Sequence, residues 1–176
     1  MENLKMSTEK LCSFYVSDWH LVTMILPYIN KELNEKANII TVLESNIEEN
    51  IKIILEKLNL KNEKEILKID WADTNGRKYA DVSEKLSKIS KDTTNIILIN
   101  GTKNYIDVVN NNIEKILGKI KNTNIKIVNC YEVTDFNGNI KEILDNHNKI
   151  LNTAGEKKIE EVFEGYTDSD REQEAL

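Results

Sequence analysis

Short apolar runs alternate with longer amphipathic stretches along almost the whole chain, and this alternation limits the folds open to it. A run such as NIILIN at 95–100 is typical of a strand that helices cover on both faces. Strands that alternate with helices build a mostly parallel sheet between two helical layers. We therefore predict an α/β three-layer sandwich with a five-stranded sheet, its strands at 11–16, 38–43, 65–71, 95–100 and 125–131.

Apolar residues spaced three or four positions apart predict amphipathic helices between the strands. Pro27 falls inside the first helical pattern, where it should kink or divide the helix. Ser45 and Asn46 precede the second pattern and are candidates for its N-cap. The helical patterns cover residues 22–33, 47–58, 108–120 and 140–151, with a weaker one through 82–89 after a loop at 73–77.

A length of 176 residues suits one domain with a sizeable core. The sequence contains no internal repeat and no linker, so we expect a single α/β domain at 1–166. The last residues, TDSDREQEAL, lack apolar periodicity and predict an acidic, flexible tail at 167–176.

The net charge of −6 argues against direct nucleic-acid binding, because the lysines are dispersed among glutamates instead of clustered. The N-terminus is polar, and nowhere do 18 apolar residues run together, so we expect a cytoplasmic protein that does not enter the membrane. The 2 cysteines are too few for a disulfide framework, which agrees with a reducing compartment.

Common cofactor motifs are missing from the sequence. It has no P-loop and no G-x-G-x-x-G, and the spacing of its cysteines and histidines gives no metal-binding pair, so we expect no cofactor. Gly101 fits either a weak anion site at a helix start or a plain turn. Cys12 and Cys130 lie within strands and are expected to be buried and reduced, although neighbouring strands could bring the thiols together.

Ligands of open parallel sheets gather at the carboxyl ends of the strands. At this edge we expect a site for a ligand or a partner. Its candidate residues are Ser17, Asp18, Trp19, His20, Asp70, Trp71, Asn100, Thr102, Tyr131 and Glu132, with His147 from the last helix.

Several of these residues also have a purely structural explanation. Ser17 or Asp18 would serve as a helix N-cap. Helical phase places Trp19 ahead of the apolar stripe, so we expect Trp19, like Trp71, to be partly exposed. His147 lies on the apolar stripe of the last helix. It is either a core histidine bonded to a backbone carbonyl or a titratable group in a pocket.

Two stretches, LCSFYVSDWH and IVNCYEVTDFNGNIKEILDNHNKIL, resemble the opening and closing segments of MEDS-type sensory domains. The likeness spans roughly residues 9–155, and the closing stretch carries its specific part. Such domains are similar to RecA-type α/β folds without the motifs for nucleotide hydrolysis, which agrees with the missing P-loop. The residues at corresponding places are Cys130, Tyr131, Asp135, Phe136 and His147.

The resemblance implies a regulatory role, because MEDS-type domains occur alone or fused to DNA-binding segments, histidine kinases or anti-sigma modules. We therefore expect a non-enzymatic, stand-alone sensory domain that binds a regulatory protein partner. The partner would be a kinase, a sigma or anti-sigma factor or a transcription regulator. A small ligand at the carboxyl edge and a homodimer are compatible with this role. The alternative is a small α/β enzyme, a hydrolase or transferase, with its site on the same edge.

Overall fold

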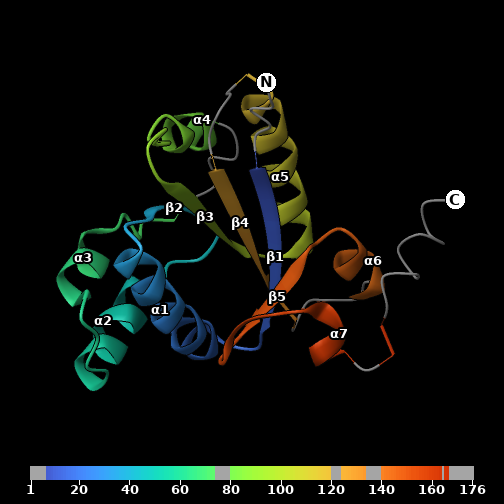
Figure 1. Cartoon of the computed structure of the whole chain (residues 1–176). Coiled ribbons are helices and arrows are strands. Elements are labelled where there is room, and N and C mark those ends of the chain that lie inside the picture. Colours follow the sequence, from blue (N-terminus) through green and yellow to red (C-terminus); the bar gives the residue numbers. More distant parts are fainter. Residues whose placement is uncertain (1–6, 74–79, 120–123, 134–139, 164, 167–176) are drawn as a thin grey trace, which may run out of the picture.

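The described residues contain six strands, which form one sheet in the order β2-β3-β4-β1-β5-β6. The structure, a computed structural model, describes residues 7–73, 80–119, 124–133, 140–163 and 165–166 (Figure 1). All neighbouring strands are parallel except β5 and β6, which form an antiparallel hairpin. The strands are β1 (Ser7–Tyr15), β2 (Asn38–Leu43), β3 (Thr94–Gly101), β4 (Asn124–Glu132), β5 (Lys149–Asn152) and β6 (Gly155–Lys157).

Helices cover both faces of the sheet, as the α/β sandwich predicted from the sequence requires (Figure 1). Side chains alternate along each strand, so Leu98 and Val128 pack under one helical layer while Ile97 and Ile127 pack under the other. The first layer holds α1 (Asp18–Asn34), α2 (Glu48–Lys57) and α3 (Glu63–Lys68); the second holds α4 (Ala80–Leu86), α5 (Lys103–Leu117), α6 (Ile140–Asp145) and α7 (Ile159–Val162).

The strand predicted at 65–71 is wrong, because this segment begins with the helix α3. Glu63 and Glu65 lie in the first turn of α3 and Lys68 in the last, which suits the helix dipole. Ile66 is buried against the core, whereas Leu67 beside it is exposed. The apolar residues of EILKIDW therefore follow a helical turn and not the alternation of a strand.

The helix predicted at 140–151 ends at Asp145, and the following residues form strand β5 instead. Asn148 explains this change, because its backbone N donates to Lys10 O and its side-chain Oδ1 accepts from Lys10 N, both at 2.7 Å. These bonds align the chain with β1. The turn at 153–154 leads into β6, whose first residue, Gly155, has a φ of 104° that favours glycine.

Two smaller expectations concern helix ends and Pro27. Helix α1 runs undivided through Pro27, because buried residues on both sides of the proline hold it against the core. Asn46 Oδ1 accepts a hydrogen bond from Glu48 N at 3.0 Å just before α2, so Asn46 stabilises this helix start. Ser45 instead accepts from the side-chain amide of Asn100 at 3.0 Å.

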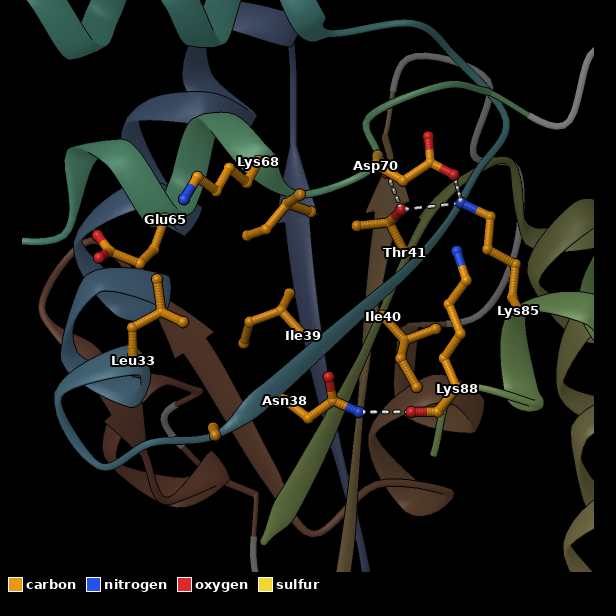
Figure 2. A pocket seen from close by; sticks show the side chains of 12 residues that line it. Leu33, Asn38, Ile39, Ile40, Thr41, Glu65, Lys68, Asp70, Lys85 and Lys88 are labelled. Carbon is orange, nitrogen blue, oxygen red and sulfur yellow. Dashed lines mark hydrogen bonds and ion pairs between the residues drawn. The ribbon is translucent and has the colours of Figure 1, made fainter. Parts of the chain in front are cut away.

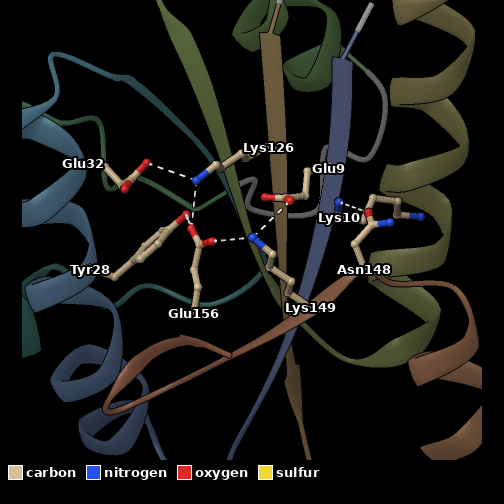
Figure 3. A network of polar contacts seen from close by, with 8 residues as sticks. All are labelled: Glu9, Lys10, Tyr28, Glu32, Lys126, Asn148, Lys149 and Glu156. Carbon is tan, nitrogen blue, oxygen red and sulfur yellow. Dashed lines mark hydrogen bonds and ion pairs between the residues drawn. The ribbon is translucent and has the colours of Figure 1, made fainter. Parts of the chain in front are cut away.

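A network of ion pairs fastens the β5–β6 hairpin to α1 and β4 (Figure 3). Glu156 on β6 accepts from Lys126 Nζ at 2.8 Å and from the Tyr28 hydroxyl at 3.1 Å. Lys126 also pairs with Glu32 at 3.5 Å, and Lys149 lies 3.5 Å from Glu156. The hairpin is therefore held by polar and charged groups of two other elements, α1 and β4.

Both cysteines are free and buried, as predicted. Their strands, β1 and β4, are neighbours, and Cys12 is paired in register with Asn129, next to Cys130. However, Cys12 packs into the core under α4–α7 and Cys130 into the core under α1–α3. The two thiols thus point to opposite faces of the sheet, which explains why adjacent strands do not produce a disulfide.

Candidate functional site

Ser17 and His20 form the N-terminal cap of α1. Ser17 Oγ accepts a hydrogen bond from His20 N at 3.1 Å, and His20 Nδ1 accepts from Val16 N at 3.1 Å. This reciprocal arrangement satisfies one open backbone donor of the first helical turn, His20 N, and the backbone N–H of Val16 just before the helix. The structural explanation of Ser17 is confirmed, and His20 shares the same role.

Trp19 lies exposed at the carboxyl edge, as predicted, with 47 % of its surface accessible. Val16 is also exposed. Asp18 lies between them in the sequence, and its pKa is raised by partial burial and by the nearby carboxylate of Glu132. The edge therefore carries two exposed apolar side chains beside two carboxylates.

Asn100 and Thr102 hold the loops of the carboxyl edge together. The buried amide of Asn100 accepts from Glu44 N at 2.9 Å, and the Glu44 carboxylate accepts from Thr102 N at 2.8 Å. A Cβ on Gly101 would collide with the Glu44 side chain, which makes glycine necessary at this turn. Thr102 Oγ1 also caps α5 by accepting from Tyr105 N at 3.3 Å. These contacts favour the plain-turn explanation of Gly101.

Trp71 and Asp70 lie beside the outer strand β2 and do not join the residues that follow β1. The expectation that Trp71 is partly exposed is wrong, because it is only 2 % accessible and its Nε1 donates to Ile66 O at 2.9 Å. It became core because α3 replaces the predicted strand. Partial burial would raise the pKa of Asp70, but bonds from Ala72 N and Lys85 outweigh it and lower that pKa.

Tyr131 and His147, in contrast, meet in a pocket of about 320 Å³ between α5 and α6. We call it the α5–α6 pocket. Its other lining residues are polar or charged side chains, apart from Ile143. They include Lys10, Lys103, Asp107, Asn110, Glu114, Asn129 and Glu142.

A buried chain of hydrogen bonds forms one side of this pocket. Asn110 Nδ2 donates to Asn129 Oδ1 at 2.9 Å, and Asn129 Nδ2 lies 2.9 Å from His147 Nε2. His147 Nδ1 lies 2.5 Å from Ile143 O. A carbonyl only accepts, so Nδ1 carries the proton and a neutral ring accepts from Asn129 at Nε2. The core explanation of His147 is confirmed, although the residue lies just after α6 and not within it.

Charged residues surround the mouth of the α5–α6 pocket. Lys103 Nζ lies 2.8 Å from Asp107 Oδ2 and 3.6 Å from Glu142 Oε1. Its hydrogen bond to Asp107, together with both negative charges, raises the pKa of Lys103 despite partial burial. Burial, with the charge of Asp107 next in importance, raises the pKa of Tyr131. Its phenol therefore stays protonated at neutral pH and can donate a hydrogen bond.

No protein-family model, curated protein or solved structure matches this chain. Within the part of the chain that the structure describes, no group of three or more His, Cys, Asp or Glu residues could hold a metal ion. The described residues also contain no helix that is long and apolar enough to cross a membrane. Asp135 and Phe136, which carry part of the resemblance to MEDS-type domains, lie outside the described residues.

Sequence reasoning missed most residues of the α5–α6 pocket. One signal was present, because Asn129 interrupts the otherwise apolar strand IVNCY, and Asn110 shares the buried stripe of α5 with Ile106 and Ile113. A buried amide must find partners, so two such positions on neighbouring elements indicate a polar cluster. Asp107 and Glu142 gave no comparable signal among the many carboxylates of the chain.

Proposed function

We propose that the chain is a non-enzymatic regulatory domain that binds a small polar ligand in the α5–α6 pocket and a partner protein at the carboxyl edge. The observation that carries this proposal is the pocket of about 320 Å³ built on the Asn110–Asn129–His147 chain. A concave site with converging polar groups is the usual place for a small ligand. The partner classes, a kinase, a sigma or anti-sigma factor or a transcription regulator, follow from the resemblance to MEDS-type domains.

Binding without catalysis is favoured because the groups suited to proton transfer are already engaged. Both ring nitrogens of His147 have hydrogen-bond partners, and Lys103 is paired with Asp107 and Glu142. A general base must reach a substrate proton with a free lone pair. In this arrangement a ligand contacts a rigid polar wall. A hydrolase or transferase would first have to break the hydrogen bonds of His147 or the ion pairs of Lys103.

The charges of the pocket indicate the ligand. Asp107, Glu114 and Glu142 stand against Lys10 and Lys103, which leaves an excess of negative charge around the opening. A ligand with an amine and with hydroxyl or amide groups would complement this lining. The Tyr131 phenol would donate to an oxygen of the ligand.

The proposed partner surface consists of Val16, Asp18, Trp19 and Glu132. An exposed tryptophan is a common anchor in protein interfaces. Strand β4 connects the two sites, because Tyr131 in the pocket is followed directly by Glu132 at this surface. A shift of Tyr131 on ligand binding would therefore move the carboxylate beside Asp18. A cytoplasmic location fits the two free cysteines.

Ligand binding can be tested by thermal shift with a library of small amines, amino acids and polyamines. A genuine ligand should raise the melting temperature of the wild type. The increase should be smaller for the variants Asp107→Asn and Tyr131→Phe. Asp92→Asn on an exposed loop is the matched control. Product analysis of the incubated ligand separates the two functions. Chemical conversion that the Tyr131→Phe variant loses would contradict the regulatory proposal and support an enzyme.

A further inference from the structure

Among the described residues no strand pairs with the outer edge of β2 along residues 39–41, and a groove of about 310 Å³ lies beside it between α3 and α4 (Figure 2). No residue of this groove lines the α5–α6 pocket. An open strand edge presents unpaired backbone groups and is a template for pairing with another chain.

The backbone of β2 leaves two residues free on this side. Glu44 N donates to Asn100 O on β3 at 3.1 Å. Because backbone N–H and C=O groups alternate in direction along a strand, those of Ile40 and Val42 point toward β3, and those of Ile39 and Thr41 point outward. Among the described residues, no hydrogen bond reaches the outward N–H or C=O groups of Ile39 and Thr41. Farther along, Leu43 already pairs with Asp73.

The two walls of the groove differ in chemistry. Leu33, Ile39 and Ile69, all half-buried, form an apolar wall on the side of α1 and α3. Lys85 from α4 and Lys88 just after this helix form the opposite wall (Figure 2). A strand added to the edge of β2 would point successive side chains to these two walls in turn.

The lysines give the groove an excess of positive charge. The Lys85 side chain is only 11 % exposed, and its Nζ contacts Asp70 at 3.1 Å and Thr41 Oγ1 at 3.2 Å. Lys88 has no carboxylate within ion-pairing distance among the described residues. With Lys68 and Glu65 on the rim included, the lining contains three lysines and two carboxylates. The Lys88 ammonium group is therefore available to pair with an anionic group of a bound segment.

We propose that this groove binds an extended segment of a partner protein in which acidic and apolar residues alternate. The segment adds to the sheet beside β2 and pairs with the backbone of Ile39 and Thr41. Its carboxylates face Lys85 and Lys88, and its apolar side chains pack on Leu33, Ile39 and Ile69. Backbone pairing supplies affinity and the unlike walls supply specificity.

The probe is the fluorescein-labelled peptide Ser-Glu-Val-Glu-Val-Glu-Ser, measured by fluorescence anisotropy with the wild-type chain. We expect saturable binding with a dissociation constant below about 1 mM. In ¹⁵N-labelled protein, the amide signals of Ile39 and Thr41 should shift on titration. Two N-methylated peptides, one methylated at the valine amides and one at the glutamate amides, each remove the backbone donors of one strand edge and keep both side-chain faces. The peptide that loses the donors facing β2 should bind more weakly by about tenfold or more. A control peptide of the same composition, in which the glutamates and the valines are grouped and do not alternate, should also bind weakly.

Protein variants test the charged wall separately. Lys88→Glu should weaken binding by about tenfold, whereas Lys115→Glu on the exposed surface of α5 should not. Absence of binding would overturn the proposal and show that the lysines only protect the strand edge. Unchanged binding of both N-methylated peptides, or equal affinity in Lys88→Glu, would also overturn it. A dimer in sedimentation that Lys88→Glu dissociates would assign the edge to a second copy instead.

Discussion

Asn129 Nδ2 on β4 and His147 Nε2 just after α6 lie 2.9 Å apart, and their hydrogen bond joins the sheet to the end of that helix. Both side chains are buried, and Asn129 is also bonded to Asn110 on α5. One amide therefore fixes two helices relative to the strand between them. The shape of the α5–α6 pocket depends on this contact.

Replacing Asn129 with alanine should destabilise the fold strongly. The change leaves Asn110 and His147 buried without their partner, and each unsatisfied group costs about 1–3 kcal/mol. We expect the free energy of unfolding in urea to fall by about 3 kcal/mol. Asn104→Ala, at an exposed position of α5, should change it by less than about 0.5 kcal/mol. Equal effects of the two substitutions would show that the chain of amides contributes nothing.

The two tryptophans should respond differently to replacement by alanine. Trp71→Ala opens a cavity in the core and removes the bond to Ile66 O, so it should cost about 3–5 kcal/mol of stability. Trp19→Ala removes an exposed side chain and should cost less than about 1 kcal/mol. Thermal melts of both variants check this difference. Early melting of Trp19→Ala would place this residue in the core and contradict the proposed partner surface.

Cys12 and Cys130 should react slowly with a thiol reagent in the native protein and rapidly after denaturation. Both are fully buried, and burial raises the pKa of Cys130 well above its ordinary value, so the reactive thiolate is scarce. A time course with Ellman's reagent, with and without urea, measures both rates. The variants Cys12→Ser and Cys130→Ser assign each phase. Rapid native labelling of either thiol would show that it is accessible and contradict its buried position.

Glu156 should make the stability of the hairpin dependent on pH. Burial would raise the pKa of Glu156, but hydrogen bonds and positive charge from Lys126, with smaller contributions from Tyr28 and Lys149, lower it. Because the folded state favours the ionised form, this stabilisation is present above the ordinary pKa of a carboxyl group. It is lost as the pH falls through the lowered value in the folded state.

The measurement compares Glu156→Gln with wild type in urea at neutral pH and at about pH 3. The variant should be less stable at neutral pH, and the difference should shrink in acid. Glu56→Gln, on the exposed side of α2, should differ little from wild type at either pH. A difference between Glu156→Gln and wild type that does not change with pH would rule out the ion pairs as its cause.

Local patterns predicted much of the fold but mistook two segments. The strands at 38–43, 95–100 and 125–131 were found because each is a long apolar run covered on both faces. Residues 65–71 and 149–152 were misassigned because short segments fit both periodicities. In the second case the decisive partner of Asn148 is Lys10, which lies far away in the sequence.

The sequence alone determined the α/β class, the mostly parallel sheet, a helix cap at Ser17 or Asp18 and the exposure of Trp19, because periodicity and capping act within a few residues. Only the tertiary structure decided which polar residues meet. Asn110, Asn129 and His147 come from three separate segments of the chain, and so do Lys85, Thr41 and Asp70. Strand order and helix packing bring these groups together, and both result from long-range contacts between distant segments of the chain.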